Sequence, residues 1–102
     1  MIKYSKIKNK PLFMIERFSK KKINKRYDLT SEDSFLQVCY LNLQKGASVK
    51  PHLHLKNSKK TTKSSEAWIV ISGSIEVTFF DVDKSKVYKS TLKKGDISIL
   101  FN

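Results

Sequence analysis

The sequence predicts an all-β protein with the architecture of a sandwich or a barrel. Short runs rich in β-branched and aromatic residues recur along the chain, and turn-forming residues separate them. Strands at intervals of roughly eight to twelve residues are typical of sandwiches and barrels. The chain has 102 residues, of which 39% are hydrophobic and 11% are aromatic. This length and composition predict a compact fold around a single core, not a disordered chain.

Strands are expected where apolar or alternating residues lie between turn residues, namely at 11–18, 34–43, 49–55, 66–71, 75–80, 86–92 and 97–101. The first two are joined by a basic polar link at 20–33. Within this link, Thr30-Ser31-Glu32-Asp33 could cap a short helical turn. We therefore treat 1–33 as an N-terminal strand followed by a link, and 34–102 as the main domain.

Turn residues define how the later strands should connect. Gly46 predicts a turn into the strand at 49–55. Ser72-Gly73 predicts a tight turn that joins 66–71 and 75–80 as a hairpin. The polar segments 81–85 and 93–96 predict the turns that follow.

The two histidines are the most informative residues of the chain. His52 and His54 lie two residues apart, and a strand would place both imidazoles on the same face. Glu66 opens the next predicted strand and could add a carboxylate from a neighbouring position. Two imidazole nitrogens and one carboxylate oxygen suit Fe(II), Mn(II), Ni(II), Zn(II) or Cu(II), and the sequence does not choose among them. The alternative is a solvated, inert histidine pair with Glu66 at an exposed strand end.

The spacing of these residues resembles the first motif of the cupins, the RmlC-like jelly-roll superfamily. The matching residues are Gly46, His52, His54, Glu66 and Gly73, and Leu92 to Asp96 resembles the opening of the second motif. The similarity covers residues 41–101. It implies an all-β, cupin-type jelly roll or partial β-barrel, with His52, His54 and Glu66 as ligands of a divalent transition metal. Trp68, two residues beyond Glu66 on the same strand face, is then expected inside or at the mouth of the barrel, as a substrate-binding residue.

The chain departs from the cupin pattern in two places. Eleven residues separate His54 from Glu66 where the motif has three or four, and this polar, lysine-rich segment predicts a solvated loop. The sequence ends at Asn102, before the histidine that the second motif supplies, so at most three protein ligands are expected. We therefore expect 34–102 to be an incomplete, C-terminally truncated cupin domain that lacks the last strands. Its strand at 97–101 would leave an open edge that favours a homodimer.

The resemblance leads to two function hypotheses. The first is a metal-binding cupin that acts on or binds a small polar ligand. A sugar or nucleotide sugar is suggested by similarity to small cupins of surface-polysaccharide biosynthesis. The second is a non-enzymatic binding or dimerisation module. The sequence leaves open whether the chain is an enzyme.

The charge of the chain bears on its partners. The formal net charge is +12, with 21 Lys plus Arg against nine acids. Only Arg17 and Arg26 are arginines, although arginine makes the bidentate contacts that specific nucleic-acid binders favour. We therefore expect a small anionic or sugar-like ligand rather than nucleic acid.

The cysteine count and the N-terminal segment bear on where in the cell the protein is located. Cys39 is the only cysteine, which rules out an internal disulfide. The apolar stretch 11–15 ends at Glu16-Arg17, so it is too short for a signal or membrane segment. A cytoplasmic protein without membrane contact is expected.

Overall fold

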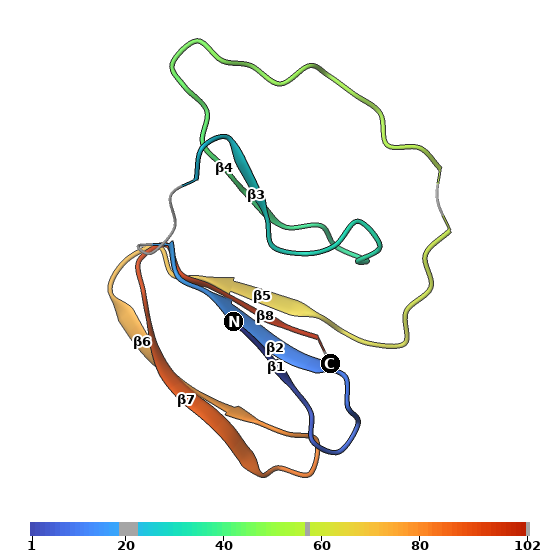
Figure 1. The fold of residues 1–102 in the computed structure, drawn as a ribbon, viewed down its shortest axis with the longest axis vertical. Coiled ribbons are helices and arrows are strands. Elements are labelled where there is room, and N and C mark those ends of the chain that lie inside the picture. Colours follow the sequence, from blue (N-terminus) through green and yellow to red (C-terminus); the bar gives the residue numbers. More distant parts are fainter. Residues whose placement is uncertain (19–22, 57, 102) are drawn as a thin grey trace. The chain divides into compact units, whose positions relative to one another are not determined.

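A computed structural model describes residues 1–18, 23–56 and 58–101. Every extended or helical element defined within these residues is a β-strand, which confirms the predicted all-β class (Figure 1). The described strands form small sheets and no closed barrel. The chain divides into two compact units: the first is Met1–Lys21 with Lys63–Asn102, and the second is Lys22–Thr62. The described residues contain no helix long and apolar enough to cross a membrane.

The first unit contains a four-stranded antiparallel sheet and a separate hairpin (Figure 1). In spatial order the sheet consists of β1 (Ile2–Tyr4), β2 (Pro11–Glu16), β8 (Ile97–Leu100) and β5 (Glu66–Ile69). The hairpin pairs β6 (Ser74–Phe80) with β7 (Lys86–Lys93). The strands predicted at 11–18, 66–71, 75–80, 86–92 and 97–101 are thus confirmed, with ends that differ by a few residues. β1 was not predicted.

The predicted hairpin between 66–71 and 75–80 is wrong. β5 pairs with β8, and β6 pairs with β7 across the turn at 81–85. The backbone explains why. Val70 donates its N–H to the carbonyl of Asp96 and accepts from the N–H of Gly95, so the pairing with the β8 side continues past the end of β5. After Val70 the chain turns away through Gly73, whose φ of +72° is one that glycine adopts readily.

The prediction of an open edge at 97–101 is also wrong. β8 is an inner strand, hydrogen-bonded to β2 on one side and to β5 on the other. Its residues Ile97, Ser98 and Ile99 are all buried. β2 covers one edge of β8 and β5 covers the other, and the alternation within 97–101 could not reveal either pairing. The homodimer that this edge was expected to favour stays a prediction.

The hydrophobic core joins the sheet to the hairpin. Its buried members come from β2, β6, β7 and the residue that follows β5: Leu12, Phe13, Ile15, Val70, Val77, Phe79 and Leu92. The ring of Phe13 on β2 stacks on that of Phe79 on β6, with centroids 3.9 Å apart. The contact buries aromatic surface of both the sheet and the hairpin. Separating the hairpin from the sheet would therefore expose both rings to water.

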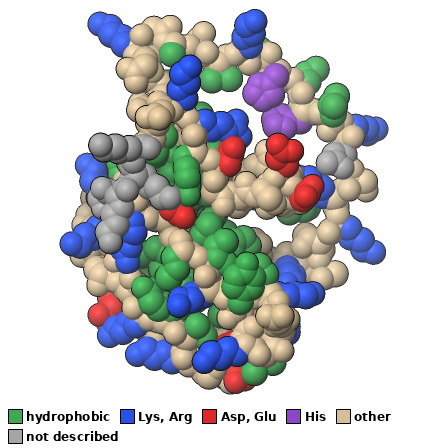
Figure 2. All heavy atoms as spheres, viewed as in Figure 1, with side chains coloured by type: hydrophobic (Ala, Val, Ile, Leu, Met, Phe, Trp, Pro, Cys, Tyr) green, Lys and Arg blue, Asp and Glu red, His purple; other side chains and the backbone are tan. Residues whose placement is uncertain are grey.

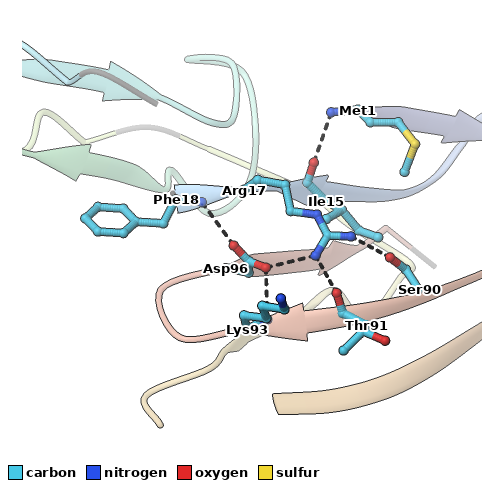
Figure 3. A network of polar contacts seen from close by, with 8 residues as sticks. All are labelled: Met1, Ile15, Arg17, Phe18, Ser90, Thr91, Lys93 and Asp96. Atoms are coloured by element: carbon cyan, nitrogen blue, oxygen red, sulfur yellow. Dashed lines mark hydrogen bonds and ion pairs between the residues drawn. The ribbon is translucent and has the colours of Figure 1, made fainter. Parts of the chain in front are cut away.

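A polar network joins β2 to the far end of the hairpin (Figure 3). Asp96 is only 2% exposed, and it accepts hydrogen bonds from the N–H groups of Lys93 and Phe18 and from Arg17. The Arg17 guanidinium also donates to the carbonyl of Thr91 and the hydroxyl of Ser90. Burial alone would raise the pKa of Asp96, but these hydrogen bonds and the charge of Arg17 outweigh it and lower that pKa.

A second buried carboxylate joins two turns. Asp81 accepts hydrogen bonds from the hydroxyl of Ser5 (2.6 Å) and from the N–H of Lys6 (2.8 Å). The Ser5 hydroxyl in turn accepts from the N–H groups of Ile7 and Lys8. The turn between β1 and β2 is thus held against the turn between β6 and β7.

The second unit has less regular structure. It contains one antiparallel pair, β3 (Arg26–Asp28) with β4 (Cys39–Leu41). β4 is much shorter than the predicted strand at 34–43, and β3 lies in the segment interpreted as a link. The predicted helical turn at Thr30 to Asp33 is not formed. Glu32 and Asp33 instead lie in a turn that the Ser34 N–H closes by donating to the carbonyl of Ser31. The domain boundary predicted between residues 33 and 34 stays a prediction.

The strand predicted at 49–55 is wrong, because these residues adopt no regular structure. Pro51 lies in the middle of this segment and has no N–H to donate to a neighbouring strand. Val49, Leu53 and Leu55 alternate with polar residues, but all three are exposed, so no neighbouring strand buries this face. The histidines therefore lie on an extended, exposed stretch and not in a sheet.

We predict that Asp96→Asn destabilises the first unit by about 2–4 kcal/mol at neutral pH, because it leaves a partly buried Arg17 without its counter-charge. The pKa of Asp96 is lowered from its usual 3.8, so its contribution is present above that pH and is lost as pH falls through the lower, folded-state pKa. Urea unfolding of both proteins should give free energies that differ at pH 7 and converge in strong acid. As a control, Asp28→Asn breaks an exposed pair with Arg26 and should cost less than about 1 kcal/mol. Equal losses in the two variants would contradict this ranking.

Ser98 provides a second test of the core. Its hydroxyl is buried and has no hydrogen-bond partner among the described residues. Because an unsatisfied buried hydroxyl carries a desolvation cost, Ser98→Ala should be neutral or stabilising by up to about 1 kcal/mol. Ser5→Ala, which removes a hydroxyl with several partners, should destabilise by about 1–2 kcal/mol. Thermal and urea unfolding measure both changes, and a clear loss of stability in Ser98→Ala would show that its hydroxyl is bonded.

Candidate metal site

The structure brings the two histidines together. His52 and His54 are exposed and belong to the second unit. Their ring centroids lie 5.1 Å apart, with an angle of 51° between the ring planes. Two imidazoles that bind one tetrahedral ion through bonds of about 2 Å have centroids separated by roughly this distance. The two rings therefore lie side by side, although no strand places them so. That their nitrogens converge on one ion stays a prediction.

A backbone contact orients one of the rings. His52 Nδ1 lies 3.2 Å from the carbonyl oxygen of Lys50. A carbonyl can only accept, so the contact is a hydrogen bond when Nδ1 carries the proton. In that tautomer Nε2 keeps its lone pair and is available to a metal ion. Metal-binding histidines usually donate their second ring nitrogen to such a carbonyl or to a carboxylate.

An open cavity of about 870 Å³ has His54 in its lining. Figure 2 shows both histidine side chains, in purple, at the surface. All residues that line the cavity belong to the second unit: Glu32, Phe35, Gln37, Leu53, His54, Leu55, Lys56 and Lys59. The ammonium group of Lys59 donates to the carbonyl of Ser34 at 2.7 Å. This bond holds the segment that follows the histidines against the turn between β3 and β4. The lining of the cavity thus combines one carboxylate, one amide and two ammonium groups with apolar side chains.

The third predicted ligand lies in the other unit. Glu66 is the first residue of β5, where it is exposed and in register with Leu100. Its membership of the histidine site stays a prediction. Across residues 1–18, 23–56 and 58–101, no group of three or more His, Cys, Asp or Glu side chains is arranged to hold an ion.

Trp68 does not have the shielded position that was expected. Its side chain lies on β5, in register with Ser98, and the residue is 40% exposed. The described strands close no barrel that could enclose the indole, and every residue of β5 is exposed. A role of Trp68 in binding a substrate stays a prediction.

Sequence reasoning missed the residues of the turn between β3 and β4 that line the same cavity as His54. Glu32 and Gln37 line the cavity, but Glu32 was interpreted only as part of a helix cap. One signal was present in the sequence. Glu32 and Asp33 are adjacent acids in a chain with a net charge of +12, and they lie in a stretch, 27–44, that has no Lys or Arg.

The resemblance to the cupins rests on the spacing of Gly46, His52, His54, Glu66 and Gly73. Gly46 and Gly73 adopt positive φ angles, as turns at both positions require. No family model, curated protein or solved structure matches the chain.

Proposed function

We propose that the chain is a metal-binding domain of the cupin type, in which His52 and His54 hold a divalent transition-metal ion. The observation that carries the proposal is the 5.1 Å separation of the two imidazole rings. The contact between His52 Nδ1 and the Lys50 carbonyl supports it, because this contact leaves Nε2 as the ligand atom. A cupin-type jelly roll belongs to the same proposal and is supported by the motif spacing and the all-β content.

The ligand that we propose is a small anionic or sugar-like molecule bound beside the ion. The cavity next to His54 has the size of a small-molecule site, which typically encloses about 300–1,000 Å³. Lys56 and Lys59 line it and would attract an anion, as would the net charge of +12. We propose binding as the function and assign no reaction.

One observation favours a second candidate, a binding module that contacts another molecule without a metal. Leu53 and Leu55, on either side of His54, are 94% and 91% exposed. Together with Phe35 they form the apolar part of the cavity wall. Exposed apolar side chains that gather at one place are typical of an interaction surface.

The metal proposal predicts that His52→Ala lowers the affinity for Zn(II) or Co(II) at least tenfold, which is about 1.4 kcal/mol. Each lost imidazole removes one of only two nitrogen ligands, so His54→Ala should have an effect of similar size. Calorimetric titration with Zn(II) and the absorption bands of bound Co(II) measure the change. Acidification should also release the ion, because a protonated imidazole has no lone pair to donate.

Lys56→Ala provides the matched control, since it changes an exposed side chain of the same cavity that is no metal ligand. It should bind Zn(II) at least as well as the unaltered protein, because a nearby positive charge is removed. Stoichiometric binding that survives the loss of both histidines would refute the proposal. So would the absence of any binding to the full chain.

A further inference from the structure

We propose that residues 5–10 and 80–86, which contain the two turns at one end of the first unit, form a surface that binds an anionic lipid bilayer. We call it the tip surface. The inference goes beyond the proposed function and uses none of the residues of the metal site. It also differs from the expectation of no membrane contact, which rested on the lack of a membrane-spanning segment. A peripheral contact needs no such segment, because lysines and apolar side chains can hold a protein at the level of the lipid headgroups.

The two turns are fastened to each other, although they lie far apart in the sequence. One turn joins β1 to β2, and the other joins β6 to β7. Asp81 of the second turn accepts hydrogen bonds from the Ser5 hydroxyl and the Lys6 N–H of the first, at 2.6 Å and 2.8 Å. Figure 1 shows the two turns side by side at the bottom of the view. They therefore present one continuous surface.

Lysines dominate the tip surface. Five of its exposed residues are lysines: Lys6, Lys8, Lys10, Lys84 and Lys86. Its acids are Asp81 and Asp83. Asp81 is buried and engaged by the first turn, so only Asp83 lies exposed among the lysines. Such a cluster attracts anionic headgroups, and each lysine close to the bilayer raises the affinity by about fivefold.

Apolar side chains lie among these lysines. Ile7 follows Lys6, precedes Lys8 and is 61% exposed. Val82 in the second turn and Phe80 at the end of β6 are exposed as well. Exposed apolar residues that gather on one surface are typical of interaction sites. Flanked by lysines, they match the boundary between the headgroups and the acyl chains of a bilayer.

The composition of the tip surface favours a bilayer over nucleic acid. All five of its cations are lysines, whereas arginine makes the bidentate contacts to phosphates and bases that specific nucleic-acid binders favour. A phosphate backbone also offers side chains such as Ile7 and Val82 no apolar region in which to be buried. The acyl region of a bilayer does so.

Two paired variants of the full chain test the role of charge: Lys6→Gln with Lys8→Gln, and Lys84→Gln with Lys86→Gln. Binding is measured by sedimentation with vesicles of phosphatidylserine and phosphatidylcholine in equal parts. Each pair should lower the affinity by about tenfold or more, because two lysines are lost from the contact. Vesicles of phosphatidylcholine alone should bind the unaltered chain far more weakly.

The matched control is Lys93→Gln with Lys94→Gln, which removes the same charge from exposed positions at the other end of the hairpin. Its affinity should remain within about threefold of the unaltered chain, because salt screens charges that lie beyond the contact.

Ile7→Ser tests the apolar contribution. It should weaken binding by about threefold or more, which is part of what full burial of an isoleucine contributes. Ile71→Ser is the matched control, because Ile71 is more exposed than Ile7 and lies outside the tip surface. It should leave the affinity unchanged. Both variants should unfold in urea like the unaltered chain, since neither side chain belongs to the core.

A second measurement uses the unaltered chain, so it does not depend on how a variant folds. Nuclear magnetic resonance with anionic lipid nanodiscs that carry a paramagnetic headgroup should broaden the amide signals of residues 6–10 and 82–86. The signals of β5 and of the turn at 93–96 should broaden less.

Several results would overturn the proposal. They are a failure of the unaltered chain to bind phosphatidylserine vesicles, an equal loss of affinity in the Lys93 and Lys94 control, and undiminished binding by Ile7→Ser. Duplex DNA provides the remaining comparison. If the chain binds DNA more tightly than the vesicles, and the paired tip variants weaken that binding, the tip surface is a nucleic-acid site instead. None of these results bears on the histidine site, which belongs to the other unit.

Discussion

The first unit depends on the contact between Arg17 and Asp96. Asp96 follows the turn between β7 and β8, and its carboxylate is almost fully buried. Its side chain fixes the end of β2 through Arg17 and Phe18, while its carbonyl accepts the N–H of Val70 just beyond β5. Through Arg17 the network also reaches β7, at Thr91 and Ser90. One residue thus sets how the sheet meets the hairpin (Figure 3).

Only an arginine could fill the position of Arg17 in this chain. Its guanidinium donates in two directions at once, to a carboxylate and a carbonyl through Nη1 and to a hydroxyl through Nη2. A lysine ammonium is a single point of charge that cannot reproduce this planar fork. Only two of the 21 basic residues are arginines, and one of them has this structural role. The net charge alone does not reveal that role.

The sequence predicted local structure better than pairing, for a physical reason. Alternation within 75–80 and the polar turn at 81–85 are local signals, and they correctly placed β6 and its turn into β7. The partners of β8 come from distant segments, and nothing within 97–101 specifies β2 or β5 as neighbours. Asp96 was predicted as a turn residue, since the sequence does not show that Arg17 would make its burial favourable.

At the candidate site, too, the sequence predicted what depends on neighbouring residues and missed what depends on distant ones. The spacing of His52 and His54 was enough to bring their rings together, because two residues of extended chain keep side chains close even without a sheet. Which acidic side chain lies near the histidines depends on contacts between distant segments. Glu66 was chosen from its place in a motif, and the cavity that contains Glu32 depends on how the turn between β3 and β4 meets the histidine segment.

The distribution of buried residues links the site to the stability of its unit. Every fully buried side chain among the described residues lies in the first unit, and the second unit is held by one strand pair and by polar contacts. A small unit without a buried core gains stability from a staple such as a metal ion. An ion bound by His52 and His54, as proposed, would order the exposed segment that carries them and stabilise this unit. The same linkage weakens the affinity, because part of the binding free energy is spent in ordering an exposed segment. Binding and local folding of the second unit would then be one equilibrium.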